Sequence, residues 1–318
     1  MLDSLQGLQP HFAEVQRHMQ LALATDEPRV AQLIADLGSF HGKMLRPALV
    51  LMVAEAVGNI STIHHRLGAA LELIHTATLI HDDLIDDANT RRGQPTAHVR
   101  FDNTTAVLLG DYFYTHAFNL IADLNNASVM KKLTTTTNII CQGELHQQCV
   151  ARDVALTEAE YNRIIFAKTA VLTELAGELG AVEGSLDQQR AAAAYGRAAG
   201  MAFQVADDCL DFSGDPQKVG KTLSTDIERG RLTLPIIRLL ENAGDNRQAL
   251  EKRLLSVSTP EEVAAVRNLI IDSGGVSAAL GTAREYVKDA QRQLGVFGQS
   301  PQRQRLWDLA EFIVARDF

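Results

Sequence analysis

The sequence is poor in aromatic residues, in basic charge and in cysteine, and each shortage argues against a class of protein. Aromatic residues make up 5% of the 318 residues and hydrophobic residues 46%, so the core must consist mainly of Ala, Leu, Ile and Val, as suits closely packed helices. The net charge of −9 argues against a nucleic-acid partner, because no basic face compensates. The three cysteines, Cys141, Cys149 and Cys209, form no C-x-x-C pair, which fits a reducing cytoplasm.

Long apolar segments are missing as well. The longest strongly apolar run, residues 48–54, is far too short to cross a bilayer. Residues 1–20 are amphipathic and include Asp3 and Glu14, so they do not resemble a signal peptide. We therefore expect a cytoplasmic protein without a transmembrane segment. The absence of a membrane span does not exclude a lipid-like product.

Helical periodicity extends along nearly the whole chain, and convincing strands of alternating polarity are missing. The eight prolines fall where helices should begin or end. We expect one all-helical domain over residues 1–318. Its main helices are predicted at residues 44–58, 64–88, 104–123, 127–150, 157–182, 187–212 and 230–242, with turns at 92–95, 125–126, 214–216 and 273–275.

Two clusters of aspartates are the most informative feature of the sequence. The first aspartate motif, residues 82–87, and the second aspartate motif, residues 207–211, each contain D-D-x-x-D inside an apolar stretch of helical spacing. Residues three or four apart share one face of a helix, so Asp82 projects with Asp86. Like charges at this spacing destabilise a helix unless a cation offsets the repulsion. Mg²⁺ typically binds a few carboxylates together with substrate phosphates, so the motifs predict a metal site for a diphosphate.

Either motif alone would be more typical of a solvated helix face. Two observations favour the metal site instead. The motif occurs twice, and both copies lie among apolar residues such as Leu84 and Leu210, whereas a solvated face is usually flanked by Lys, Glu and Gln.

Basic residues alternate with the acidic motifs along the chain. The residues concerned are Lys43, Arg46, Arg91, Arg92, Lys168 and Lys221. The first two stand at the start of a predicted helix, the end that favours anions. The next two directly follow the first aspartate motif and offer guanidinium forks to phosphate oxygens. Each basic residue alone is ordinary on a surface, but their order around the two motifs indicates a diphosphate site.

With these motifs the chain resembles the trans-type (head-to-tail) isoprenyl diphosphate synthases, also called polyprenyl synthetases. Residues 79–87, followed by Arg91-Arg92-Gly93, look like the family's first aspartate-rich motif; residues 203–212 look like its second. Residues 41–47 are similar to its GGKxxRP motif. The resemblance covers residues 42–235 and implies an all-α isoprenoid synthase type I fold, a single large helical bundle around a central cavity. It also implies a homodimer.

The resemblance further implies two adjoining diphosphate sites. Asp82, Asp86 and Asp207 would hold about three Mg²⁺ ions on the allylic diphosphate, with Mn²⁺ as a candidate substitute. The remaining aspartates, expected to support the ions through water or through neighbouring groups, are Asp83, Asp208 and Asp211. The implied contacts of the allylic diphosphate are Arg91, Lys168, Thr169, Gln204 and Lys221. Those of the second substrate, isopentenyl diphosphate, are Lys43, Arg46, His75 and Arg92.

The family's reaction suits these residue types, and Asp82, Asp86, Lys168, Asp207 and Lys221 are the expected catalytic residues. Metal ions and cationic side chains stabilise the leaving diphosphate, so the allylic C–O bond ionises and the isopentenyl double bond attacks the cation. A proton is then lost, with the released diphosphate as the expected acceptor. We find no persuasive Ser/His/Asp or Cys/His arrangement, which agrees with a reaction that needs no protein nucleophile.

His75 and four departures from the family pattern need separate mention. A lone histidine in an apolar stretch is more often a core residue, but His75 stands about two helical turns before Asp82 and can face the same cavity. The departures are His41 and Met44 in the first basic loop, Ser224 where glycine is usual, and Arg231 where lysine is common. They put loop geometry and turnover in doubt more than the fold.

The residues before Asp82 predict a long product. Synthases of fifteen-carbon products typically carry bulky aromatics four or five residues before this aspartate, where this chain has Ala77 and Thr78. Ile74 and Leu71 are then candidates for a lower wall, and we expect a product of more than twenty carbons. The string of residues 74–81 resembles octaprenyl-type enzymes in particular.

Several alternatives stay open. A short-chain (farnesyl or geranylgeranyl) diphosphate synthase would share the same motifs. A terpene cyclase shares the fold class, but it usually has an Asn/Ser/Glu triad as its second metal motif and lacks an isopentenyl site. A non-catalytic partner subunit of a heteromeric synthase would typically have lost the aspartates, whereas this chain keeps both sets.

Overall fold

The computed structural model describes residues 7–37, 44–213 and 225–315. These residues are predominantly helical, which confirms the all-α prediction. Their contacts group them into two compact units, which we describe separately. Unit 1 consists of the described parts of Met1–Thr135, Leu175–Ala193 and Val296–Leu306, and unit 2 of those of Thr136–Glu174, Ala194–Gly295 and Trp307–Phe318. The single domain over residues 1–318 stays a prediction.

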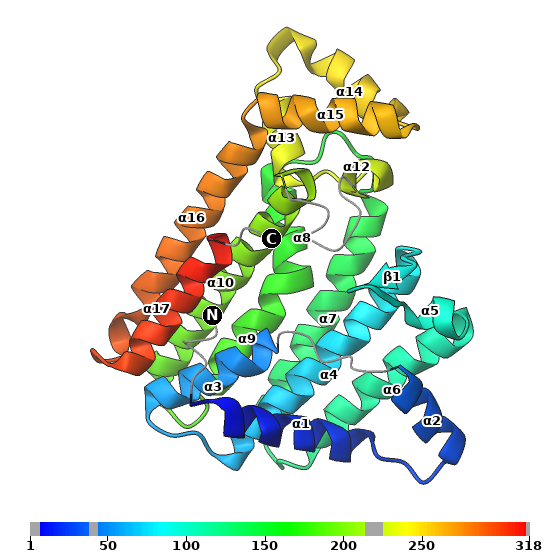
Figure 1. The fold of residues 1–318 in the computed structure, drawn as a ribbon. Coiled ribbons are helices and arrows are strands. Elements are labelled where there is room, and N and C mark those ends of the chain that lie inside the picture. The colour runs from blue at the N-terminus through cyan, green and yellow to red at the C-terminus, as the bar shows by residue number, and fades with distance from the viewer. Residues whose placement is uncertain (1–6, 38–43, 214–224, 316–318) are drawn as a thin grey trace. The chain divides into compact units, whose positions relative to one another are not determined.

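Unit 1 is built around α4, which is buried on nearly all its sides between Leu67 and Ala77. Helices α1, α3 and α6 pack against it, α6 most extensively (Figure 1). A Cβ at Gly68 would make ordinary van der Waals contact with Val15 and Pro47, at 3.4 and 3.5 Å, so α4 lies directly against α1 and α3 at this position. The elements are α1 (Gln9–Leu23), α2 (Pro28–Asp36), α3 (Leu45–Val57), α4 (Thr62–Ile85), β1 (Thr90–Arg91), β2 (Gln94–Pro95), α5 (Ala97–Arg100) and α6 (Asn103–Ala122).

Unit 2 has its own apolar core, formed by side chains such as Phe212, Ile237 and Ile270. Helix α13 packs along α16 in this unit (Figure 1), and Gly275 allows the contact, because a Cβ there would lie 2.5 Å from the carbonyl oxygen of Pro235. The elements are α8 (Glu158–Ile165), the π-helical segment η2 (Phe166–Ala170), α12 (Thr225–Arg229), α13 (Leu234–Glu241), η3 (Gly244–Asn246), α14 (Arg247–Ser256), α15 (Pro260–Asp272) and α16 (Gly275–Gln293).

Several described elements contribute residues to both units. They are α7 (Ala127–Cys149), α9 (Val171–Gly180), α10 (Leu186–Ser213), η4 (Leu294–Val296) and α17 (Pro301–Val314).

Most predicted helices are confirmed, and three need correction. The helix predicted at 64–88 ends at Ile85, for a reason given with the site below. The helix predicted at 157–182 is divided into α8, η2 and α9. The helix predicted at 230–242 begins only at Leu234, because Gly230 ends α12 with φ of +66° and Pro235 lies in the first turn of α13.

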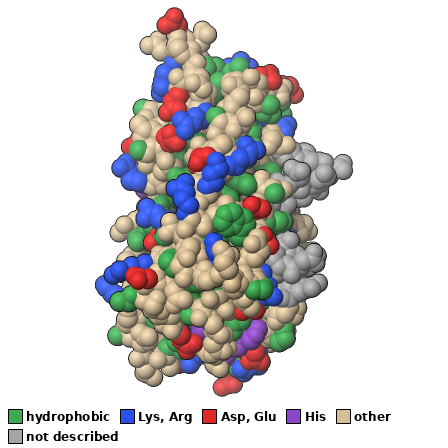
Figure 2. Space-filling model, turned by 90° about the vertical axis from the view of Figure 1, so that its left-hand side faces the viewer, with side chains coloured by type: hydrophobic (Ala, Val, Ile, Leu, Met, Phe, Trp, Pro, Cys, Tyr) green, Lys and Arg blue, Asp and Glu red, His purple; other side chains and the backbone are tan. Residues whose placement is uncertain are grey.

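The predicted turns at 92–95, 125–126 and 273–275 are present, and Asn125 and Gly274 have positive φ of +52° and +79°. The turn predicted at 214–216 lies outside the described residues. Among the described helices, no single one has the length and apolar composition of a membrane span. One pair bent by 58°, Pro260–Asp272 with Gly275–Val296, meets these criteria only jointly. On the face drawn in Figure 2, basic side chains lie among acidic ones, with hydrophobic side chains scattered between them.

Candidate active site

The first aspartate motif lies at the C-terminal end of α4, and the helix stops inside it. Asp82 and Asp83 belong to the last turn, Asp86 is the C-cap, and Asp87 has a left-handed φ of +49°. The N–H of Ala88 donates to the Asp83 carbonyl at 2.9 Å, the long hydrogen bond of a Schellman motif. Aspartate tolerates this conformation better than most residues, which explains the early end of the helix. The N–H of Asp86 still donates to the Asp82 carbonyl at 2.8 Å, so the two aspartates lie one turn apart, as predicted.

Both motifs place their acids at the end of a helix that already carries partial negative charge. Asp211 stands two residues before α10 ends at Ser213, just as Asp82 stands near the end of α4. A carboxylate at a helix C-terminus is unfavourable by about 0.3–1 kcal/mol, the reverse of its effect at the N-terminus. This electrostatic cost, incurred twice, requires positive charge or hydrogen-bond donors nearby.

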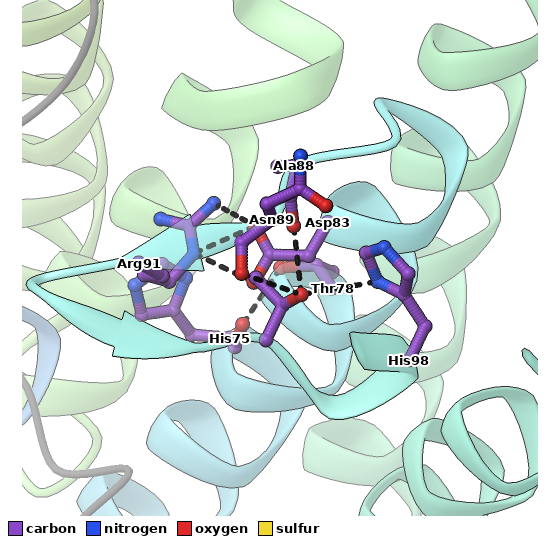
Figure 3. Close-up of polar contacts among 8 residues, drawn as sticks. His75, Thr78, Asp83, Ala88, Asn89, Arg91 and His98 are labelled. Carbon is purple, nitrogen blue, oxygen red and sulfur yellow. Dashed lines mark hydrogen bonds and ion pairs between the residues drawn. The ribbon is translucent and has the colours of Figure 1, made fainter. Parts of the chain in front are cut away.

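Asp83 is buried, with 6% of its surface exposed, and it forms a two-pronged ion pair with Arg91 (Figure 3). Nε of Arg91 donates to both carboxylate oxygens at 2.9 Å, and Nη2 lies 2.8 Å from Oδ1. Arg91 lies on β1, which pairs with β2 in a hairpin whose central residues, Arg92 and Gly93, have φ of +53° and +74°, as in a type I′ turn. The hairpin thus returns Arg91 to the end of α4. The side chain of Arg91 remains 41% exposed.

The loop between α4 and α5 is closed by short-range hydrogen bonds (Figure 3). The hydroxyl of Thr96 donates to the carbonyl of Ala88 at 2.7 Å. Nδ1 of His98 lies 3.2 Å from the same hydroxyl, and its Nε2 lies 3.8 Å from Oδ1 of Asp87. These contacts hold the residues that follow the first aspartate motif.

A second polar group lies around α4, within the region predicted to bind isopentenyl diphosphate. Glu72 is 2% exposed, and burial raises the pKa of its carboxyl group. The positive charges of Arg46 and Arg92 partly offset this rise. Burial lowers the pKa of His75 well below its usual value, and the charges of Arg46, Arg91 and Arg92 lower it further. The imidazole is therefore neutral near pH 7, beside three guanidinium groups. Lys43, predicted for the same site, lies outside the described residues.

In unit 2, Lys168 lies in the π-helical segment η2, a feature frequently found at functional sites. Its ammonium group is 2.8 Å from Oε1 of Glu144 and also donates to the side-chain carbonyl of Gln147, both on α7. Gly143 permits this approach, because a Cβ there would lie 2.5 Å from the Cβ of Ala167. Lys168 is therefore held in place by two residues that the sequence analysis did not identify.

The second aspartate motif takes part in a network of hydrogen bonds within unit 2. Asp208, 7% exposed, accepts from the hydroxyl of Tyr161 at Oδ2 (2.6 Å) and from Nε2 of Gln204 at Oδ1 (2.7 Å). The hydroxyl of Thr169 donates to Oε1 of Gln204 at 2.6 Å. Burial and the charge of Asp208 raise the pKa of Tyr161 well above its usual value, so the phenol stays protonated. Thr169 and Gln204, both predicted as site residues, are thus brought together.

Asp211 is also buried and engaged by the protein. It is 3% exposed, and its Oδ2 accepts from the backbone N–H of Asp226 at 3.1 Å, at the start of α12. By contrast, Asp82, Asp86 and Asp207 are only partly buried. Each unit therefore offers partly exposed carboxylates, supported by buried ones.

The predicted residues divide between the two units. Unit 1 brings together Arg46, His75, Arg91 and Arg92 near the first motif, and unit 2 brings together Lys168, Thr169, Gln204 and the second motif. Lys221 and Ser224 lie outside the described residues. That Asp207 meets Asp82 and Asp86 at shared ions stays a prediction.

Sequence reasoning missed four polar residues, Glu72, Glu144, Gln147 and Tyr161. Only Glu72 had a recognisable signal, because a single acid inside the apolar run 67–74 must find a partner when buried. The other three become recognisable only through their neighbours in space.

The donor chemistry fits a hard divalent cation. All three predicted ligands offer carboxylate oxygens, which Mg²⁺ and Ca²⁺ prefer. Within the described part of either unit, no three His, Cys, Asp or Glu side chains converge as a closed cage.

Comparisons with known proteins identify the family of this chain. The family model of the polyprenyl synthetases matches residues 27–271. An octaprenyl diphosphate synthase of Haemophilus influenzae is 32% identical over 321 residues, covering 100% of this chain and 98% of the relative. A polyprenyl synthase of Caulobacter crescentus CB15, solved with calcium and isoprenyl diphosphate, is 32% identical with a TM-score of 0.94, covering 100% of this chain and 98% of that one. A decaprenyl diphosphate synthase of Rhodobacter capsulatus is 34% identical with a TM-score of 0.92, covering 99% of both chains.

Proposed function

Because this chain belongs to the polyprenyl synthetase family, we propose that it condenses isopentenyl diphosphate head-to-tail with an allylic diphosphate. The allylic primer is of the geranyl or farnesyl class, and the product is an all-trans polyprenyl diphosphate of more than twenty carbons. The observation that carries this proposal is the shared construction of the two aspartate motifs. In each, a partly exposed aspartate stands beside a buried one that protein donors hold in place.

The allylic diphosphate would be bound by Asp82, Asp86 and Asp207 through about three Mg²⁺ ions, with Mn²⁺ as a candidate substitute. The bound ions would supply positive charge that makes the diphosphate a better leaving group. Arg91, Lys168, Thr169, Gln204 and Lys221 would contact the same diphosphate. Lys168 supports this role, because its ion pair with Glu144 fixes a cation on the same segment as Thr169.

Isopentenyl diphosphate would bind at Lys43, Arg46, His75 and Arg92. The neutral imidazole of His75 suits this role, because it can accept a hydrogen bond from a neighbouring guanidinium group or donate one to a phosphate oxygen without changing its charge near pH 7. In the reaction, the allylic C–O bond breaks and the diphosphate leaves with its electron pair. The isopentenyl double bond then forms the new C–C bond, and the proton lost passes to the released diphosphate.

One incubation tests the activity. The purified protein is mixed with Mg²⁺, isopentenyl diphosphate and farnesyl diphosphate, and the products are sized. Polyprenyl diphosphates longer than twenty carbons are expected. Products of only fifteen or twenty carbons would identify a short-chain synthase, cyclic hydrocarbons would identify a cyclase, and no turnover would leave a non-catalytic partner subunit.

The product length rests on Ala77 and Thr78, before the first aspartate motif. Ala77, Ile74 and Leu71 on α4 are all fully buried in unit 1. Substituting Ala77→Tyr should place a bulky ring in the path of the growing chain and shorten the products. An unchanged length distribution, with a melting temperature equal to that of the wild type, would contradict this assignment.

We further propose a homodimer and a cytoplasmic location with peripheral membrane contact during product release. The molar mass measured by light scattering should be twice that of the 34.7 kDa chain. Co-sedimentation with lipid vesicles, before and after turnover, tests the membrane contact.

A further inference from the structure

Tyr161 stands at the end of a hydrogen-bonded network that reaches two predicted diphosphate contacts. From Tyr161 on α8 the network passes to Asp208 and Gln204 on α10, and then to Thr169 in η2, with distances of 2.6, 2.7 and 2.6 Å. Tyr161 itself is 3% exposed, and we have placed it in no contact with substrate. The network therefore links a buried phenol to the predicted diphosphate site.

The charge of Asp208 determines the direction of each hydrogen bond in this network. An ionised carboxylate only accepts, so Tyr161 and the amide nitrogen of Gln204 must both donate to it. The amide oxygen of Gln204 is then the atom turned to Thr169, whose hydroxyl donates to it. The single hydroxyl proton of Thr169 is thus engaged, whereas the amide group of Gln204 retains a second N–H.

We propose that Tyr161 is a positioning residue of the second aspartate motif, which orients Gln204 through Asp208 so that the second amide N–H of Gln204 serves the allylic diphosphate. This revises the role proposed above for Thr169, because its hydroxyl then fixes the amide oxygen of Gln204 and does not donate to the diphosphate. This inference rests on the proposed function, because it assigns the amide hydrogen to that substrate.

The hydroxyl of Tyr161 is the feature that matters at this position, because it donates to Asp208 where both residues are shielded from solvent. Both Tyr161 and Asp208 are buried, so a phenylalanine would leave Oδ2 of Asp208 without this donor. The loss of this donor weakens the positioning of the carboxylate and hence of Gln204, which donates to its other oxygen. The raised pKa of Tyr161 is consistent with a permanent donor, since it keeps the phenol protonated over the working pH range.

The test compares Tyr161→Phe with a matched control, Tyr286→Phe. Tyr286 on α16 donates to Oδ1 of Asn162, the residue after Tyr161 on α8, at 3.4 Å, and it lies outside the network. We expect Y161F to raise the KM for farnesyl diphosphate about tenfold, because hydrogen bonds to charged groups are the strong ones. The KM for isopentenyl diphosphate should change less than twofold, and Y286F should leave both unchanged.

An equal change in both KM values for Y161F, or no change in either, would overturn the proposal. If Y161F does not fold, Thr169→Val carries the test from the other end of the network, with the same split in KM expected. If Y161F does fold, the effects of Y161F and T169V in the double variant should be less than additive, because both act through Gln204. Full additivity would assign Thr169 an independent contact and overturn its role here.

A binding measurement separates this inference from the proposed function. Titration of inorganic pyrophosphate with Mg²⁺ into the wild type and Y161F should give weaker binding in the variant. If the wild type makes no prenyl product but Y161F still binds pyrophosphate more weakly than Y286F does, the function fails and the positioning role stands. Equal pyrophosphate binding in all three proteins would overturn the positioning role, whatever the activity.

Discussion

The two aspartate motifs have the same residue pattern but different support. In the first, buried Asp83 is neutralised by a cation, Arg91, which follows eight residues later on a hairpin. In the second, buried Asp208 accepts hydrogen bonds from uncharged donors, among them Tyr161, which lies 47 residues away in the sequence. The same motif can therefore be supported by an ion pair with a residue close in the sequence or by a hydrogen bond from a residue far away in it. In the first motif the supporting side chain, Arg91, is 41% exposed. In the second, both Tyr161 and Asp208 are buried, so their contact depends on how the helices pack.

The largest expected effect tests whether the two motifs are equivalent in function. Asp82→Asn and Asp207→Asn should each lower kcat/KM on the order of a hundredfold to a thousandfold, because each removes charge stabilisation of the leaving diphosphate. Asp245→Asn, at an exposed position on η3, serves as the control. If only one of the two substitutions impairs turnover, the motifs do not share one reaction.

Packing beside the second motif is tested at Gly143. Gly143→Ala should lower the free energy of unfolding by about 1–3 kcal/mol, because the new methyl group would meet Ala167 at 2.5 Å and force α7 away from η2. Gly281→Ala in α16 is the matched control, since a Cβ at this position meets nothing within 4 Å. This substitution should stabilise the protein by about 0.5–1 kcal/mol, because alanine favours a helix more than glycine does. Urea unfolding measures both, and equal effects would show that the close approach is unimportant.

The ion pair of the first motif is tested at Arg91. Arg91→Gln should destabilise the protein by about 1–2 kcal/mol, because Asp83 is buried, although the exposure of Arg91 reduces the effect below that of a fully buried pair. Arg17→Gln breaks an exposed pair with Glu14 and should change stability by less than about 0.5 kcal/mol. Chemical denaturation of both variants gives the comparison. If R91Q loses no more stability than R17Q, the buried Asp83 does not depend on Arg91 for its stabilisation.

The smallest expected effect concerns the pH dependence of stability, and it tests His75 in the region around α4. The pKa of His75 is lowered in the folded protein, so between pH 7 and pH 5.5 the unfolded chain takes up a proton that the folded chain does not. The folded state should lose about 1 kcal/mol over this interval through His75. His75→Gln should reduce the acid-induced loss by that amount, whereas His146→Gln, at an exposed position, should not. Identical pH profiles for wild type and H75Q would contradict the burial of a neutral imidazole.

Much of the fold and part of the site could be predicted from the sequence. The predicted helices at 44–58, 104–123 and 127–150 agree with α3, α6 and α7 to within a residue or so at each end, because apolar periodicity and prolines are local signals. The end of α4 could not be placed, because the left-handed conformation at Asp87 is usually marked by glycine. Segment η2 was missed because the sequence of a π-helical turn does not differ visibly from that of an α-helix.

The sequence by itself determined which residues carry charge and where most of the helices run. It also determined that each aspartate motif lies in an apolar stretch and has acids one helical turn apart. Only the tertiary structure decided which of those acids are engaged by the protein. Asp208 is held by Tyr161, and Lys168 by Glu144, through contacts between helices that are distant in the sequence. The physical reason is one of range: helical periodicity depends on neighbours within four residues, whereas a buried polar group must find its partner among whichever side chains packing brings within about 3 Å.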